Sequence, residues 1–170
     1  MTLLILNGGS CSGKSTIIKH IMKQKEHLFH LSYDALKWHF SHYHHTTHYD
    51  DIQEVILAIA ESVFKLKYDI ISDSALYKKS RDKLVALAKS FGYEVIEINL
   101  TAEPEVLAQR FDERVAGSLA DPSKRISNLS KDRFWELIEI FEQNKNPLAT
   151  LFRTDNQSIE EVAEQILKFL

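Results

Sequence analysis

Residues 5–19, ILNGGSCSGKSTIIK, combine a run of small residues with a lysine and neighbouring hydroxyl groups. Gly8, Gly13, Lys14 and Ser15 have the G-x-x-x-x-G-K-S spacing of a phosphate-binding loop. Small residues let backbone N–H groups turn toward an anion, the next helix adds its positive N-terminal end, and the lysine adds a full charge. Ser15 supplies the hydroxyl that such loops offer to Mg²⁺. The spacing therefore predicts a site for a nucleoside triphosphate.

The surroundings of this loop match that prediction. A short apolar run precedes the loop, and STIIKHIMK, residues 15–23, is a reasonable helix opening. The alternative is a tight Gly/Ser turn between a strand and a helix. We expect ATP and Mg²⁺ as cofactors, with Lys14 reaching the β- and γ-phosphates. The residues expected to bind the nucleotide are Gly8, Gly9, Ser10, Cys11, Ser12, Gly13, Lys14, Ser15 and Thr16.

This sequence lacks the signature motifs of other classes of P-loop protein. The string NKNP at 144–147 lacks the aspartate of the guanine-reading N-K-x-D motif, and no D-x-x-G switch sequence occurs. The apolar run ending IISDSA carries one aspartate, where motor ATPases usually carry an acidic pair. A small kinase is therefore the expected class. A non-catalytic ATP-binding module is the alternative.

Two aspartates could face the acceptor hydroxyl of such a kinase. In HLFHLSYDALKWHF, Asp34 follows the second apolar run and could accept the proton of the attacking hydroxyl. Asp34 could equally cap the helix that begins there, and both roles are compatible. Lys37, one turn on, could bind an anionic acceptor group or remain solvated. Asp73 closes the third run and could hold the acceptor, orient Mg²⁺ through water, or serve as a turn residue.

Arginines could stabilise the negative charge that spreads over a transferred phosphoryl group. Arg110 and Arg114 are four residues apart, on one helical face, and we expect both to be catalytic. Arg125 and Arg133 lie in and just after an irregular segment, 115–130, which could close over ATP as a lid. The alternative is a salt-bridged surface helix.

The segment HFSHYHHTTH, residues 39–48, holds five histidines. Histidines spaced by three and four can bind a metal on a helix, but no cysteine or carboxylate pattern completes a site here. An aromatic, histidine-rich substrate flap is another reading. A solvent-exposed loop is the simplest one, and we place it first.

The apolar patterns along the chain predict the elements that would hold these residues. Short apolar runs alternate with helical stripes, which indicates an α/β fold with a parallel sheet. The apolar stripe over 52–66 predicts a helix that is capped by Asp50 or Asp51. Gly92 is expected at the C-terminal end of another helix, and Ser158 is expected to cap the N-terminus of a third. Pro104 fits the first turn of another helix. The five expected strands are Leu3–Leu6, Leu28–Leu31, Ile70–Ser72, Val95–Asn99 and Leu148–Phe152.

Composition sets the remaining expectations. The chain has 170 residues, 44% of them hydrophobic, which suits one domain over residues 1–170. The net charge of −3 does not favour a nucleic-acid partner, although a local basic groove would be compatible with one. Cys11 is the one cysteine and no apolar run approaches the length of a membrane span, so we expect a cytoplasmic protein without membrane contact.

The same motifs carry a resemblance to a known group. ILNGGSCSGKST, Asp34, residues 69–100 and EVLAQRFDER together resemble the AAA-type small P-loop kinases related to polynucleotide 5′-hydroxyl kinase, zeta toxin and chloramphenicol phosphotransferase. The resemblance spans most of the chain. It implies a three-layer P-loop NTPase fold, nucleoside-kinase-like, with a five-stranded parallel sheet and a small arginine-bearing lid.

The resemblance also implies roles for individual residues. Lys14 and Ser15 would hold ATP and Mg²⁺, Asp34 would be the acceptor base, and Arg110 and Arg114 would stabilise the transferred phosphate. The segment Arg153–Ser158 would contact adenine. The implied acceptor is a nucleoside, a nucleotide or a nucleic-acid 5′ end, and the alternative is the hydroxyl of a small metabolite or antibiotic. Lys37 stands where polynucleotide kinases place an arginine, and it cannot make the same bidentate phosphate contact.

Overall fold

A computed structural model describes residues 1–74, 77–120 and 129–170. Their strands form a five-stranded sheet in the order β2-β3-β1-β4-β5, and every neighbouring pair is parallel. This confirms the α/β fold with a parallel sheet, and each expected strand is present within a few residues of its predicted bounds. The strands are β1 (Thr2–Gly8), β2 (Leu28–Leu31), β3 (Asp69–Ser72), β4 (Glu94–Thr101) and β5 (Thr150–Arg153).

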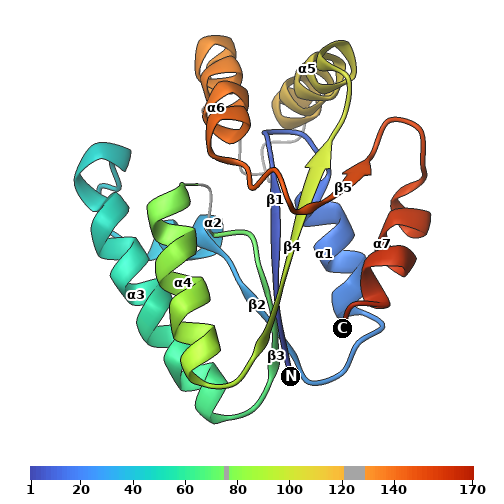
Figure 1. The fold of residues 1–170 in the computed structure, drawn as a ribbon. Helices are drawn as coiled ribbons and strands as arrows, with labels where there is room; N and C mark the ends of the chain where they lie inside the picture. Colours follow the sequence, from blue (N-terminus) through green and yellow to red (C-terminus); the bar gives the residue numbers. More distant parts are fainter. Residues whose placement is uncertain (75–76, 121–128) are drawn as a thin grey trace.

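Helices cover both faces of the sheet (Figure 1). They are α1 (Lys14–Met22), α2 (Tyr33–Leu36) with a 3₁₀ turn at Lys37–His39, α3 (His45–Lys65), α4 (Lys78–Ser90), α5 (Pro104–Ala120), α6 (Lys131–Asn144) and α7 (Ile159–Leu167).

The central strand β1 is buried along its whole length and sorts its side chains by alternation. Leu3 and Ile5 pack into the cluster formed with α3 and α4. Leu4 and Leu6 pack on the opposite face, in the cluster formed with α1 and α7. These two apolar clusters make the three layers, and they hold the C-terminal end of β1 in a fixed position.

A third apolar cluster lies beyond the C-terminal edge of the sheet, between α5 and α6 (Figure 1). The rings of Phe111 and Phe134 stack there with centroids 4.6 Å apart. Ile138 of α6 comes close to Gly9, because a Cβ added to that glycine would lie 3.2 Å from Ile138 Cγ1. Helices α5 and α6 are thereby fixed beside the loop that follows β1.

Several expected helix ends are confirmed. Pro104 begins α5, Ser158 caps α7 within a capping box, and Gly92 follows α4 with a positive φ of 76°. No helix in the described ranges is long and apolar enough to cross a membrane.

Two expectations were wrong. Helix α3 begins at His45 rather than at Asp50 or Asp51, because the His48 ring accepts a hydrogen bond from the His44 backbone N–H and satisfies the first turn. Helix α5 continues to Ala120, so residues 115–120 are helical where an irregular segment was expected. Residues 121–128, with Arg125, lie outside the described part of the chain.

Candidate active site

The loop from Gly8 to Lys14 joins β1 to α1, and its backbone at Gly8 passes very close to neighbouring atoms. A Cβ at Gly8 would lie 2.5 Å from Ser12 Oγ and 2.8 Å from the Leu100 carbonyl oxygen, so a side chain does not fit there. Gly13 has a φ of 92°, in the left-handed region that favours glycine, and it caps α1. The α1 N-terminus therefore opens onto the loop, in the geometry that binds phosphate.

Lys14 lies back across its own loop. Its ammonium donates to the carbonyl oxygens of Gly8 at 2.6 Å and Gly9 at 2.9 Å. Burial lowers its pKa from the ordinary lysine value, while the carboxylates of Asp73 and Asp34 oppose that shift and Arg114 adds to it. Both aspartates and Arg114 line the same cavity as the lysine.

One cavity of about 540 Å³ gathers most of the predicted site. Its walls come from the phosphate-binding loop, from the ends of β2 and β3, and from α5, and Ile159 of α7 completes them. Gly8, Gly9 and Lys37 do not line it. The lining residues are Ser10, Cys11, Ser12, Gly13, Lys14, Ser15, Thr16, Asp34, Asp73, Arg110, Arg114 and Ile159.

Asp34 presents its carboxylate openly at this cavity. It lies in the first turn of α2, which Ser32 caps, so the N-cap role considered for Asp34 belongs to Ser32. The side chain of Asp34 is 75% exposed, and Lys37 Nζ lies 2.5 Å from its Oδ1. Lys37 also lies 5.1 Å from the Trp38 ring. Lys37 thus contacts the expected base and does not reach the phosphate-binding cavity.

Asp73 occupies a more enclosed position at the end of β3. Its side chain is 9% exposed, and its Oδ1 lies 3.5 Å from His30 Nε2. Neither of these two buried atoms has a hydrogen-bond partner among the described residues.

A second, smaller cavity of about 180 Å³ adjoins the first. The two share Ser10, Lys14, Asp34 and Asp73, so the smaller cavity lies on the side of the phosphate-binding loop where the two aspartates lie. Sequence reasoning missed Asn7, Tyr33 and Leu137 in its walls. Asn7 directly precedes the phosphate-binding loop, and this position in the sequence was the one signal that could have predicted its place in the cavity wall. The lining residues are Leu6, Asn7, Gly8, Ser10, Lys14, Tyr33, Asp34, Asp73 and Leu137.

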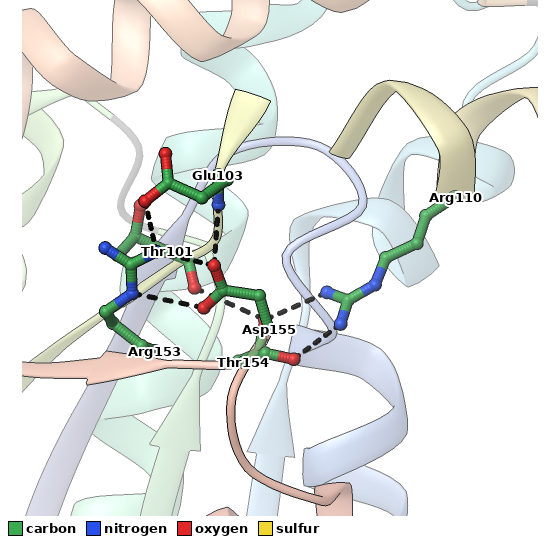
Figure 2. A network of polar contacts seen from close by, with 6 residues as sticks. All are labelled: Thr101, Glu103, Arg110, Arg153, Thr154 and Asp155. Atoms are coloured by element: carbon green, nitrogen blue, oxygen red, sulfur yellow. Dashed lines mark hydrogen bonds and ion pairs between the residues drawn. The ribbon is translucent and has the colours of Figure 1, made fainter. Parts of the chain in front are cut away.

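The three described arginines that were predicted to act on the phosphate, Arg110, Arg114 and Arg133, lie in different environments. Arg110 is held in place: it donates to the Thr154 side chain at 2.9 Å, to the Thr154 carbonyl at 2.5 Å and to the Cys11 carbonyl at 3.5 Å. Figure 2 shows its guanidinium reaching the segment after β5. Arg114 is exposed at the cavity one turn on. Arg133 pairs with Glu136 at 2.5 Å and lines neither cavity.

The segment after β5 is fixed by a second polar network (Figure 2). Arg153 forms ion pairs with Asp155, at 2.5 Å, and with Glu103. Asp155 also accepts a hydrogen bond from the Glu103 backbone N–H at 3.0 Å. The hydrogen bonds to Arg153 hold the pKa of Asp155 well below its ordinary value. The expected adenine segment, Arg153–Ser158, is thereby anchored beside the cavity wall that Ile159 forms.

The histidine-rich segment leaves the 3₁₀ turn at His39 and becomes α-helical from His45, where its rings pack against tyrosines. His45 and Tyr49 lie with ring centroids 5.3 Å apart, and Tyr49 and Tyr33 with centroids 5.6 Å apart. Burial, and next the charge of Arg133, lowers the pKa of His45. Among the described residues, no group of three or more His, Cys, Asp or Glu side chains could hold a metal ion. The solvent-exposed loop placed first in the sequence prediction was wrong for 45–48, which lie in α3.

The oxygen atoms that line the cavity suit a Mg²⁺ ion that is bound mainly by a nucleotide. The Ser15 hydroxyl and the Asp73 carboxylate line one cavity, and both are oxygen donors. Mg²⁺ commonly binds one or two protein oxygens together with substrate phosphates and water, so a cage of protein ligands is unnecessary.

Solved structures share this fold across nearly the whole chain. APE1195 is 18% identical with a TM-score of 0.72, over 99% of this chain and 93% of that one. Kti12 of Chaetomium thermophilum, solved with ADP-AlF3, is 16% identical with a TM-score of 0.68, over 98% and 97%. A gluconokinase from Sinorhizobium meliloti 1021 is 20% identical with a TM-score of 0.65, over 98% and 90%.

No curated protein sequence matches the chain. The structural likenesses show the fold of small P-loop kinases, as the sequence motifs predicted. The family model AAA_33, described as an AAA domain, matches residues 3–161. The chain therefore belongs to this AAA domain family.

Proposed function

We propose that this protein is an ATP- and Mg²⁺-dependent kinase that transfers the γ-phosphoryl group to an acceptor hydroxyl. The observation that carries the proposal is the 540 Å³ cavity, in which the phosphate-binding loop faces Asp34, Asp73 and Arg114. A site that only held ATP and Mg²⁺ would need the loop and one carboxylate for the metal, whereas this cavity presents two carboxylates. The fold shared with the gluconokinase, and with Kti12 solved with ADP-AlF3, supports this reading.

The loop would bind the phosphates of ATP. Backbone N–H groups from Gly9 to Ser15 and the α1 N-terminus would hold the oxygens, and Lys14 would exchange its bonds to Gly8 and Gly9 for the β- and γ-phosphates. Ser15 would hold Mg²⁺, which when bound neutralises charge on the phosphate oxygens. Arg110 holds the segment after β5 against the phosphate-binding loop and so shapes the side of the cavity where adenine would lie.

Asp34 would accept the proton of the acceptor hydroxyl. The hydroxyl oxygen forms its bond to the γ-phosphorus while the bond between that phosphorus and the β–γ bridging oxygen breaks, and ADP leaves. A positioned base of this kind contributes roughly a hundred- to ten-thousandfold in rate. Lys37, with its Nζ 2.5 Å from the Asp34 Oδ1, holds the orientation of the carboxylate between turnovers.

Arg114 would stabilise the phosphoryl group in transit. Its side chain is exposed at the cavity that Lys14 also lines, so it is placed to reach the expected γ-phosphate position. Within the described residues no hydrogen bond or ion pair of its side chain is seen, in contrast to Arg110, and it is therefore free to move onto a phosphate. The acceptor would be a nucleoside, a nucleotide, a nucleic-acid 5′ end or a small hydroxylated metabolite or antibiotic, in a cytoplasmic setting.

The test is an acceptor screen with γ-labelled ATP and Mg²⁺. The panel contains nucleosides, nucleotides, 5′-hydroxyl oligonucleotides, sugars and hydroxylated antibiotics, each run beside the Asp34→Asn variant. We expect label on one chemical class with the wild type and none with the variant. Tight ATP binding without transfer to any member of the panel would favour the non-catalytic ATP-binding module instead.

A further inference from the structure

Asn7 is a buried polar residue with an unused hydrogen-bonding group. It is 6% exposed, and its Nδ2 has no hydrogen-bond partner among the described residues. Leaving a buried amide donor unpaired typically costs about 1–3 kcal/mol. Such a group is retained where a ligand completes its hydrogen bonding or where the fold has another use for it.

The position of Asn7 places its side chain on the acceptor side. Leu3 and Ile5 of the same strand pack toward α3 and α4, in the cluster that also contacts Tyr33. Because side chains alternate along a strand, Asn7 shares their face. It lines the 180 Å³ cavity together with Tyr33, Asp34 and Asp73. Its amide therefore belongs to the wall of this cavity and not to the opposite, α1 face.

The cavity offers a specific set of polar groups. Asp34 and Asp73 can accept hydrogen bonds from two hydroxyls, and the Asn7 amide can donate to an oxygen. Asp73 Oδ1, like Asn7 Nδ2, has no hydrogen-bond partner among the described residues. A volume of about 180 Å³ admits a compact group and no large ring system. An acceptor with a single isolated hydroxyl would leave most of these groups unpaired.

We infer that Asn7 binds the acceptor and that the acceptor is a compact polyhydroxylated molecule or moiety, such as a sugar, a sugar acid or a ribose. The inference rests on the proposed kinase function and narrows its substrate class. Asp34 takes the reacting hydroxyl, Asp73 takes a second one, and Asn7 donates to a further oxygen of the same acceptor. A site built to hydrogen-bond its substrate rejects analogues that lack the bonded oxygen much more strongly than an apolar pocket rejects a missing methylene.

A purely structural role is the competing explanation. Asn99 lies opposite Asn7 in the β1–β4 register, and its Oδ1 is also buried without a hydrogen-bond partner among the described residues. The two amides could pair after a side-chain rotation. Asn99 differs in two respects: its Nδ2 donates to the Asn146 carbonyl at 2.8 Å, and Asn99 lines neither cavity of the site. Asn99 is thus a matched control for Asn7.

The test compares polyols with simple alcohols as acceptors. Sugars, sugar acids, inositols and nucleosides are run against ethanol, benzyl alcohol and other monofunctional alcohols, with γ-labelled ATP. We expect transfer to at least one polyol and to no simple alcohol. For the best acceptor, Asn7→Leu should raise the acceptor KM about tenfold, the loss of one hydrogen bond, with ATP affinity unchanged. The increase should vanish for the deoxy analogue that lacks the oxygen bound by Asn7.

Asn7→Ala fits in the same space and serves as the second variant if leucine disturbs the fold. Asn99→Leu should lower the thermal unfolding midpoint and leave the acceptor KM unchanged. Transfer to simple alcohols but not to polyols would overturn this inference and leave the kinase proposal standing. So would an unchanged acceptor KM in both Asn7 variants. ATP binding with no transfer to any hydroxyl compound would overturn both.

Discussion

Lys14 is placed where its charge is costly for the fold and useful for phosphate binding. Its ammonium is buried beneath the loop and paired only with carbonyl oxygens and, at 3.5 Å, with Ser12 Oγ among the described residues. Burial accordingly lowers its pKa. A triphosphate would supply the countercharge that the loop carbonyls do not.

We expect Lys14→Met to lose ATP turnover by at least roughly a hundredfold without a loss of stability, because removing a buried charge relieves its desolvation. Since the folded-state pKa lies below 10.5, the unfolded chain binds more protons between these two values. Wild-type stability relative to the variant should therefore rise with pH over that interval. Urea unfolding at neutral and alkaline pH measures this. Full turnover in the variant would contradict the assignment.

Arg110 and Arg114 share a helical face but have different contacts, so their substitutions should differ. Arg110→Ala removes the bonds to Thr154 and to Cys11 and should lower both the unfolding temperature and ATP affinity. Arg114→Ala should leave the unfolding temperature unchanged and lower the transfer rate by roughly tenfold or more. Thermal unfolding and single-turnover transfer separate the two. Equal effects on stability would refute the distinction.

At the scale of elements, the site depends on where strands end and helices begin. Asp34 and Asp73 follow β2 and β3, Lys14 follows β1, and parallel strands bring these ends to one edge of the sheet. Helix α5 adds Arg110 and Arg114 from above that edge. The third apolar cluster, between α5 and α6, fixes this position.

Helix α7 begins beside the site with a full capping box. Ser158 Oγ accepts from the Glu161 N–H at 3.2 Å, and Glu161 accepts from the Ser158 N–H at 2.8 Å. Ser158→Ala should destabilise the protein by about 1 kcal/mol in urea unfolding. Ser62→Ala is the matched control, because among the described residues that exposed hydroxyl bonds only the Ala58 carbonyl within α3. Its change should stay within about 0.5 kcal/mol. Equal effects of the two substitutions would count against the cap.

At the scale of the whole molecule, acidic groups near the C-terminal segment set the response to pH. Hydrogen bonds lower the pKa of Asp155, through Arg153, and of Glu161, through Ser158. The stability they contribute is present above the ordinary carboxyl pKa and is lost as pH falls through the lower folded-state values. The unfolding temperature should therefore decline as pH falls from about 5 toward 2. Asp155→Asn should make that decline shallower, and an unchanged slope would contradict the assignment.

Much of this architecture follows from local patterns in the sequence. The five strands, the phosphate-binding loop and the Ser158 cap each have a signal within a few residues, and each is present. The start of α3 was missed because a histidine ring satisfies its first turn, which cap statistics do not favour. Residues 121–128 of the predicted lid lie outside the described part of the chain.

The site was predictable where motif and topology agree. Loop residues 10–16, Asp34, Asp73 and both arginines of α5 meet in one cavity, as expected. The anchoring of Arg110 by Thr154 was not predictable, because it depends on how β5 and α5 pack. Asn7 and Tyr33 carry no motif of their own, and only the cavity that they line reveals them.

The most direct measurement compares wild type and Asp34→Asn in two assays on the same preparation: calorimetric binding of ATP·Mg²⁺ and single-turnover transfer of the γ-phosphoryl group to the best acceptor of the screen. The account predicts equal ATP affinity and a transfer rate reduced roughly a hundred- to ten-thousandfold. Transfer at the wild-type rate by the variant would contradict the central claim that Asp34 is the base of a hydroxyl kinase.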